Sequence, residues 1–433
     1  MRPLTPFSFL HCADLHLDSP FEGIKAVNER VAATLRDATF AALDNIAKLA
    51  VDRRVDFVLI AGDVFDGADH SLRAQLCVQE FLARLTDAGI ACCVVHGNHD
   101  PLDAWQLRLA WPQGVSRFES DAVERVTMRR GDVPLADVYG VSFPTRDVKE
   151  NLARRFRIQG EAPFAIGLLH ANVGGREDHA NYAPCTLEDL AAAGMNYWAL
   201  GHIHQPAVLR EQKPTVVYAG APQGRSVKDA GPRGCYVVHV HENGVVEPEF
   251  VATDVIRWFV RELDIAGLAD LDALVGRLCE ERETIRSEAE GRAAVARMKL
   301  VGRGPVHHEL IAGEGADRQC EDLLERMHAE EAGRDDFVWF ESLTAHTRPD
   351  IDLAARRQAD DFIGDFLRAT EAMQKAADPA ATLLELAMSR PESGRENGPV
   401  ANRLRRWTHE DWSEALADAE ALGVELLTDG RED

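Results

Sequence analysis

The chain has 433 residues, of which 45% are hydrophobic and 28% are charged, and its 72 acidic and 48 basic residues give a formal net charge of −24. This length and composition are typical of a folded protein with roughly two or three domains, and they exclude a collagenous, low-complexity or largely disordered chain. The negative charge excludes nucleic-acid binding through a broad basic surface, so any anionic substrate must be attracted locally.

Short β-rich runs alternate with helical stretches over the first 255 residues. Most of these runs are continuously apolar, as strands covered on both faces are. We expect strands at residues 7–11, 57–61, 91–96, 137–142, 164–170, 197–200, 215–219 and 235–241. Amphipathic spacing predicts helices at residues 31–50 and 72–85. The alternation predicts a layered α/β domain, and the turn at residues 242–244 indicates a partly antiparallel second sheet.

The pattern changes near residue 254. A strand is expected at 258–265, a charged helix at 270–290, a strand at 294–301 and a helix at 317–329. This order predicts a small α+β domain, and from about residue 346 the chain is helical and acidic. The predicted domains are therefore 1–255, 256–345 and 346–433.

Two features are missing from the sequence. No stretch approaches the roughly 18 uninterrupted apolar residues that a membrane span requires, so we expect a cytoplasmic protein with no membrane contact. The eight cysteines are scattered without a C-x-x-C pair, so neither a zinc knuckle nor a disulfide framework is expected.

Five polar clusters each follow the end of a predicted strand. They are residues 14–16 (DLH), residues 62–66 (GDVFD), residues 97–100 (GNHD), His170 and residues 201–204 (GHIH). Ligands of α/β sheets bind beyond the carboxyl ends of the strands, so these clusters are expected to converge on one place. A single histidine there would more often be structural, but no hydrophobic core requires this arrangement.

The side chains in these clusters are suited to metal binding. Carboxylate oxygen, imidazole nitrogen and amide oxygen are ligands that Mn²⁺, Fe and Zn²⁺ accept, unlike metals that prefer thiolates. About seven such ligands suit two ions roughly 3.5–4 Å apart, bridged by one carboxylate and by a water that becomes a hydroxide nucleophile. Such a pair stabilises in-line attack on a phosphorus centre.

The order D-x-H, G-D-x-x-D, G-N-H-D, H, G-H-x-H resembles that of the calcineurin-like metallophosphoesterases over the first 255 residues or so. Within that superfamily, residues 11–21 (HCADLHLDSPF) and 62–66 (GDVFD) look like the SbcD-type DNA repair exonucleases. The resemblance implies a four-layer α/β/β/α sandwich with a small α+β capping domain and a helical C-terminal region.

The resemblance also implies a role for each matching metal ligand. Seven residues would hold two divalent ions, expected to be Mn²⁺, with Fe or Zn²⁺ as alternatives. The first ion would be bound by Asp14, His16 and His204, the second by Asn98, His170 and His202, and Asp63 would bridge the two.

Four further residues are candidates for the chemistry. His99 would lie beside the metals without binding them, where it would donate a proton to the leaving oxygen or stabilise charge on the phosphate. Asp66 and Asp100 are candidates to orient it, although an Asp after a strand is often only a helix N-cap. Arg225 follows a glycine-rich turn and is a candidate to steer a phosphate, although an arginine in a loop is more often a solvated charge.

We therefore expect a two-metal phosphodiesterase, a DNA exonuclease or endonuclease of DNA repair that uses a metal-bridging hydroxide. A phosphatase or a cyclic-nucleotide phosphodiesterase would use the same ligands, and an acidic protein suits a small anion better than a duplex. A regulatory subunit of a DNA-repair complex is the remaining alternative, although every ligand position carries a competent residue.

Partners are implied by the resemblance as well. It implies an SMC-like ATPase of the SbcC type that holds the DNA, and dimerisation of the chain with itself. Apolar residues of the C-terminal region could dock on that ATPase or pack on the chain's own capping domain. These residues are Phe362, Phe366, Leu367, Leu383, Leu384 and Leu386.

Overall fold

The structure, a computed structural model, describes residues 4–19, 29–66, 71–103, 111–160, 162–175, 181–313, 315–331, 333–375 and 407–429. Contacts divide the chain into two compact units. The first comprises Met1–Arg261, Glu281–Arg297 and Arg326–Ser342, and the second comprises Glu262–Glu280, Met298–Glu325 and Leu343–Asp433. The three domains expected from the sequence remain a prediction.

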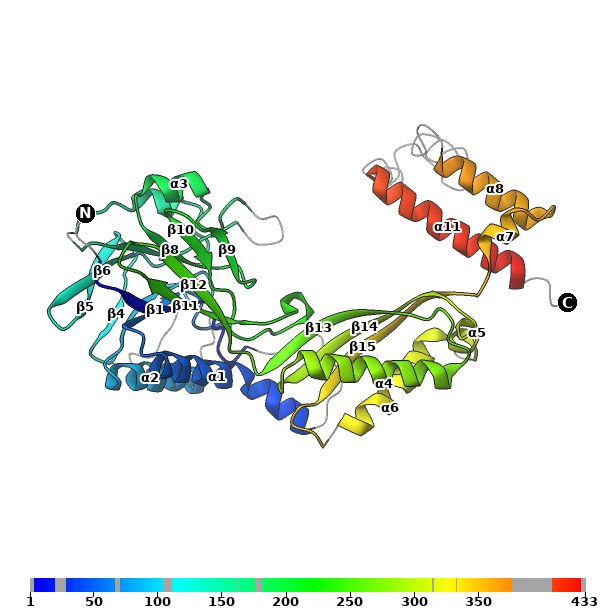
Figure 1. Ribbon diagram of the computed structural model, residues 1–433, viewed down its shortest axis with the longest axis horizontal. Helices are drawn as coiled ribbons and strands as arrows, with labels where there is room; N and C mark the ends of the chain where they lie inside the picture. The colour runs from blue at the N-terminus through cyan, green and yellow to red at the C-terminus, as the bar shows by residue number, and fades with distance from the viewer. Residues whose placement is uncertain are drawn as a thin grey trace. The chain divides into compact units, whose positions relative to one another are not determined.

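A six-stranded sheet in the order β12-β11-β1-β2-β3-β4 forms one half of the sandwich in the first unit (Figure 1). Its strands are β1 (Phe7–Cys12), β2 (Phe57–Ala61), β3 (Ala91–Val95), β4 (Val115–Arg117), β11 (Gly234–Val240) and β12 (Val246–Ala252). The first four are parallel, and the β11–β12 hairpin joins β1 in antiparallel orientation. The turn at residues 242–244 therefore belongs to this sheet and not, as predicted, to the second one.

The second sheet is also six-stranded, in the order β5-β6-β7-β8-β10-β9. Its strands are β5 (Glu124–Arg130), β6 (Val133–Gly140), β7 (Ala165–His170), β8 (Tyr197–Gly201), β9 (Ala207–Arg210) and β10 (Thr215–Tyr218). The central strands are parallel, whereas β5 and β9 pair in antiparallel orientation at the two edges. The sheet is thus partly antiparallel, although through strands that were not predicted.

Helices cover the outer face of each sheet. Apolar residues of α1 (Glu29–Asp52) and α2 (Leu72–Asp87) pack on the first sheet. The short helices η1 (Leu152–Arg155) and α3 (Leu187–Ala192) pack on the second, where Trp198 of β8 donates a hydrogen bond from Nε1 to the carbonyl of Leu190 over 3.0 Å. The predicted four-layer α/β/β/α sandwich is confirmed.

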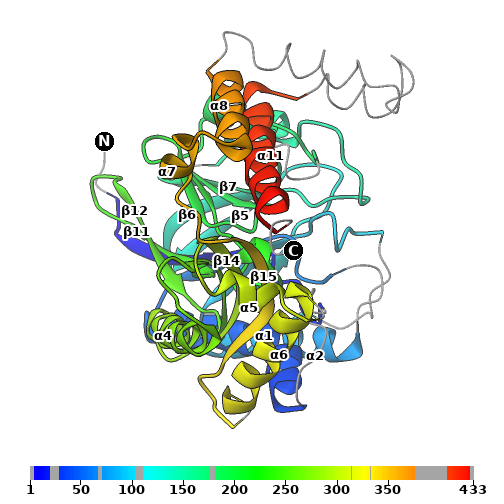
Figure 2. The ribbon, with the colours of Figure 1, turned by 90° about the vertical axis from the view of Figure 1, so that its right-hand side faces the viewer.

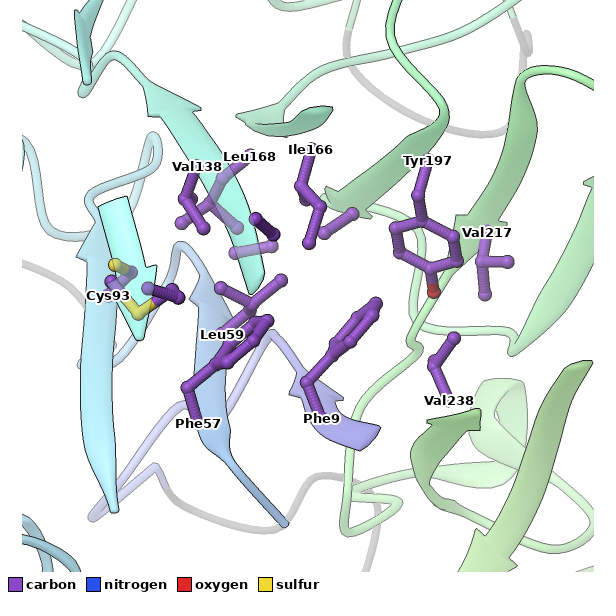
Figure 3. Packing of buried hydrophobic residues seen from close by; sticks show 14 of the residues in the cluster. Phe9, Phe57, Leu59, Cys93, Val138, Ile166, Leu168, Tyr197, Val217 and Val238 are labelled. Atoms are coloured by element: carbon purple, nitrogen blue, oxygen red, sulfur yellow. The ribbon is translucent and has the colours of Figure 1, made fainter. Parts of the chain in front are cut away.

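The core between the sheets combines aromatic and aliphatic side chains (Figure 3). Phe9 stacks on Phe57 with ring centroids 5.1 Å apart, and its edge meets Tyr197 of the facing sheet at 5.2 Å. The Tyr197 hydroxyl also lies 3.0 Å from Nδ1 of the buried His11. Because close-packed interiors resist sliding, these contacts fix how the carboxyl ends of the two sheets face each other.

A third sheet has the order β13-β14-β15, with strands Ile256–Asp264, Ala293–Arg303 and Val338–Arg348. The helices of this part of the chain are α4 (Leu271–Glu288), α5 (His307–Ile311) and α6 (Ala316–Glu331). The sequence predicted two of the three strands and missed β15. Within the first unit, Leu35 of α1 joins Trp258, Val295 and Trp339 in one buried cluster.

The C-terminal helices are α7 (Leu353–Arg357), α8 (Phe362–Gln374) and α11 (His409–Asp429), and Figures 1 and 2 both show α8 and α11 side by side. Leu367 is fully buried with Val424 of α11, so its side chain is not free to dock on a partner, and the partly buried Phe366 packs on the same cluster. Phe362 is 65% exposed, whereas Leu383, Leu384 and Leu386 lie outside the described residues.

Two predicted absences can be compared with the structure. Among the described residues, no helix is long and apolar enough to cross a membrane. All eight cysteines are free, and six of them are buried.

Candidate metal centre

The carboxyl ends of β1, β2 and β3 in the first sheet face those of β7 and β8 in the second. His170, the last residue of β7, directs Nδ1 to the carbonyl oxygen of Ala61 at the end of β2, 2.9 Å away. The backbone N–H of His202, just after β8, donates to both carboxylate oxygens of Asp14 over 3.0 and 3.1 Å. Asp63 and Asn98 also contact His170, so the five clusters predicted to converge do meet.

The backbone bends sharply where these side chains leave the strands. Asp14 and Asp63 both have a φ of 51°, and His202 has a φ of 100°. Non-glycine residues seldom adopt this left-handed region, and each instance costs on the order of 1–3 kcal/mol. Such strain persists where surrounding contacts enforce it, which is common at functional sites.

Asp14, His16 and His204 form one group of potential ligands. Each offers an atom within 4.8 Å of an atom of the other two. The Nε2 atoms of His16 and His204 are 3.1 Å apart. This group is the set predicted for the first ion.

A second group surrounds Asn98. Its side-chain oxygen lies 3.0 Å from Nε2 of His170 and 3.2 Å from Nδ1 of His202. Asp63 lies between the groups, with Oδ2 3.4 Å from Nε2 of His170 and 3.8 Å from Nε2 of His16. All seven predicted ligands are therefore gathered, and their role as ligands stays a prediction.

The charges of the site fit a pair of divalent cations. Burial lowers the pKa of His16 to about 3, so its imidazole is neutral, as a metal ligand must be. Burial alone would also lower the pKa of His170, but the carboxylate of Asp63 outweighs it and raises that pKa to about 9. The buried carboxylate of Asp63 thus favours positive charge at this place, and a metal ion would supply that charge in place of the proton.

His99 belongs to a separate chain of contacts beside the two groups. Its Nδ1 lies 2.6 Å from Oδ1 of Asp66, while Oδ2 of Asp66 accepts hydrogen bonds from Ser19 over 2.5 Å and from Nη1 of Arg225 over 2.8 Å. Burial would lower the pKa of His99, but the contact with Asp66 and the charge of Asp63 raise it. The guanidinium of Arg225 thus contacts Asp66, and its role in steering a phosphate stays a prediction.

Asp100, the second carboxylate expected to orient His99, makes its contacts with other groups. Its carboxylate is fully buried and accepts hydrogen bonds from the backbone N–H of Gly97 over 2.8 Å and of Val64 over 2.9 Å. It also lies 3.1 Å from Nδ1 of His96. Asp100 therefore holds the loops after β2 and β3 together, whereas Asp66 is the carboxylate that contacts His99, and its role in orienting that ring stays a prediction.

Asp229 was not singled out from the sequence, yet it contacts the site. It ends η2 (Val227–Asp229), is buried, and places Oδ1 3.3 Å from Nδ1 of His204. Its segment, residues 226–230 (SVKDA), carries no motif that would have marked it.

Gly97 provides a steric test of the site. A Cβ at this position would lie 2.8 Å from the ring of His170 and closer still to Oδ1 of Asp63. Gly97→Ala should therefore displace both side chains and weaken Mn²⁺ binding by about 10–100-fold, the range seen when the support of a metal ligand is lost. Isothermal titration of the metal-free protein measures this effect.

The control for that experiment is Gly276→Ala, because a Cβ at Gly276 within α4 would meet nothing within 4 Å. Alanine favours a helix interior by up to about 1 kcal/mol, so this variant should bind Mn²⁺ like the wild type and be at least as stable. Equal affinities of the two variants would mean that the site tolerates displacement of Asp63 and His170.

Residues 7–206 match the family model for calcineurin-like phosphoesterases, and residues 258–348 match the model for the middle domain of the metallophosphoesterase YhaO. The chain is 37% identical over 361 residues to the uncharacterized metallophosphoesterase YhaO of Bacillus subtilis (strain 168), with 83% of this chain and 86% of that protein covered.

Two further relatives have names that refer to DNA or to a nuclease. The DNA double-strand break repair protein Mre11 of Methanopyrus kandleri is 26% identical over 75% of this chain and 72% of its own length. The SbcD subunit of the nuclease SbcCD from Bacillus subtilis (strain 168) is 25% identical over 51% of this chain and 63% of its own length.

Proposed function

Because the chain belongs to the calcineurin-like metallophosphoesterases, we propose that it is a two-metal phosphodiesterase that acts on DNA. The position of Asp63 carries this proposal, since the carboxylate lies between His16 of one ligand group and His170 of the other. The relatives named as a DNA double-strand break repair protein and as part of a nuclease support DNA as the substrate.

The donor atoms fit two divalent ions, with Mn²⁺ preferred and Fe or Zn²⁺ as alternatives, because carboxylate, imidazole and amide groups are all present. Asp14, His16 and His204 would hold one ion and Asn98, His170 and His202 the other, with Asp63 shared between them. When bound, such ions lower the pKa of a water molecule and neutralise charge on a phosphate.

The protein side chains supply the proton transfer. His99 is 30% exposed, so it can reach a bound phosphodiester, and Asp66 holds its Nδ1. That contact favours the protonated ring, which can donate a proton from Nε2 to the leaving oxygen. Arg225 and Ser19 fix the second oxygen of Asp66, and so keep this carboxylate in the orientation that His99 requires.

A DNA substrate is repelled by the chain's formal net charge of −24, and binding must overcome this repulsion. Attraction by the metal site reaches only about 8 Å at physiological salt, the Debye length, so the isolated chain should bind duplex weakly. We propose that an SMC-like ATPase of the SbcC type holds the DNA, that residues 256–345 position it as a capping domain, and that residues 346–433 bind the ATPase. Because an acidic protein repels a small anion less than a duplex, a small phosphodiester is the alternative substrate.

Three substrates test the proposed function: bis-p-nitrophenyl phosphate, p-nitrophenyl phosphate and end-labelled linear DNA, each with Mn²⁺, Mg²⁺ or Zn²⁺. Hydrolysis of the diester and of DNA, with little turnover of the monoester, is the expected result. Preference for the monoester would indicate a phosphatase. Metal binding without turnover of any of the three would favour a regulatory subunit.

Two exposed leucines on α11 offer a test of the partner surface. Leu422 and Leu426 lie one turn apart and are 53% and 67% exposed. Leu426→Asp should weaken binding to the purified ATPase by about tenfold or more, because a charge cannot occupy an apolar interface core. Hydrolysis of the small diester should not change.

Val245→Asp is the matched control for this measurement, since Val245 is 54% exposed at the turn before β12. Binding of the ATPase to this variant should equal that of the wild type. Equal binding by Leu426→Asp as well would place the partner surface elsewhere.

A further inference from the structure

We propose that Asp229 is a positioning residue for His204, one that fixes the imidazole with Nε2 directed into the metal site. The inference rests on the proposed role of His204 as a metal ligand. Oδ1 of Asp229 lies 3.3 Å from Nδ1 of His204, while Nε2 on the other side of the ring lies 3.1 Å from Nε2 of His16. The carboxylate and the metal site thus contact opposite nitrogens of one ring.

The chemical reason lies in the two tautomers of a neutral imidazole. A carboxylate at Nδ1 keeps the ring hydrogen on that atom, so the lone pair stays on Nε2 and becomes more basic. A metal-binding histidine with no such acceptor spends part of its time in the wrong tautomer or orientation. Asp229 therefore raises metal affinity without contacting the ion.

Asp229 is itself held from several directions. The residue is 6% exposed, and Oδ2 accepts a hydrogen bond from the backbone N–H of Arg225 over 3.1 Å. The buried Arg233 joins the two partners, because Nε donates to the carbonyl of Asp229 over 2.9 Å and Nη1 to the carbonyl of His204 over 2.6 Å. The distance between Asp229 and His204 is thus fixed through backbone as well as side chain.

The segment that carries Asp229 is also anchored on β13. The buried Gln223 accepts a hydrogen bond from the backbone N–H of Val255 over 2.9 Å and donates one to the carbonyl of Ile256 over 2.7 Å. Trp258 donates from Nε1 to the carbonyl of Gly224 over 3.0 Å. These contacts hold the carboxylate in place before any ion binds, as a positioning role requires.

Titration of the metal-free, full-length protein with Mn²⁺ tests the proposal. Asp229→Ala should weaken one of the two binding events by about 10–100-fold, the cost of removing a carboxylate behind a ligating histidine. Asp229→Asn keeps the shape of the side chain and loses only its charge, so a smaller loss is expected. This second variant keeps the test valid if Asp229→Ala folds poorly.

Ser226→Ala is the control, because the Ser226 hydroxyl caps the same short helix by accepting from the N–H of Lys228 over 3.3 Å. This variant loosens η2 while leaving the contact with His204 intact, and it should bind both ions like the wild type. An equal loss of affinity in Ser226→Ala and Asp229→Ala would mean that helix stability, and not the carboxylate, sets the affinity.

A double-mutant cycle isolates the pair. In a His204→Ala background, Asp229→Ala should have no further effect on Mn²⁺ affinity, because the ring that it positions is gone. Full additivity of the two effects, or unchanged affinity in Asp229→Ala and Asp229→Asn, would overturn the inference and leave the two-metal function standing. Failure of the wild type to bind Mn²⁺ would overturn both.

Discussion

Replacing Asp63 by Asn is expected to remove both metal ions from the purified protein. Asp63 is 2% exposed, and its Oδ2 lies 3.4 Å from His170 and 3.8 Å from His16, one residue of each ligand group. The amide has no charge and only one oxygen, so at least one ion would lose a ligand and the repulsion between the two ions would be less well screened, which weakens the binding of both. Elemental analysis after purification in Mn²⁺ should fall from two ions per chain to less than one.

Asp137→Asn is the matched control for this change. Asp137 is equally buried at 2% exposure, but it lies on β6 and belongs to neither ligand group. It accepts a hydrogen bond from the hydroxyl of Thr127 over 2.6 Å. Both variants lose a buried carboxylate, and only Asp63→Asn should lose metal. Full retention of both ions by Asp63→Asn would show that the carboxylate is not a bridge.

The parts of the fold that the sequence predicted are those in which burial determines the residue type. All five residues of β2 are buried, and so are all six of β7, because each strand is covered on both faces. Such strands must be continuously apolar, and the sequence shows this directly. Strand β5 has one buried residue in seven, since it lies at an edge, so its sequence ERVTMRR has no apolar run to detect.

Long-range pairing could not be predicted in the same way. The sequence predicts β11 and the turn after it but not β12, and nothing local determines that β11 pairs with β1. The choice of sheet depends on contacts between residues far apart in the chain, such as Phe7 with Val240. The sequence thus predicts one strand and the turn after it, and leaves the pairing partners of that strand open.

The residues of the candidate site also fall into those that the sequence could predict and those that only the structure shows. The seven predicted ligands were marked by residue types that no core requires at the ends of strands. Asp66 and Asp100 could not be separated, because both follow a strand and both are acidic. Only the geometry shows that Asp66 contacts His99 while Asp100 accepts hydrogen bonds from the backbone. Asp229 carried no signal, since its position depends on how the segment after Gln223 is anchored to β13.

His99→Ala is expected to lower phosphodiesterase activity by about 10²–10⁴-fold, which is the usual range for loss of a general acid or base. The variant should still bind two ions. His99 contacts Asp66 through Nδ1, which leaves Nε2 for a substrate oxygen. Activity on the small diester and metal content, measured on the same preparation, check this expectation. Asp66→Asn should cause a smaller loss of activity. His241→Ala is the control and should cause no loss, because it changes a histidine that is 51% exposed.

His99 also offers an atom within 4.8 Å of His16 and Asp63, so the competing assignment is that it binds a metal ion. Loss of metal in His99→Ala would establish that assignment. If metal is retained, the leaving group decides between the remaining roles. A general acid matters most when the leaving oxygen is basic, so activity should fall further on a dinucleotide than on bis-p-nitrophenyl phosphate. Equal losses on the two substrates would mean that His99 stabilises charge on the phosphate and does not donate the proton.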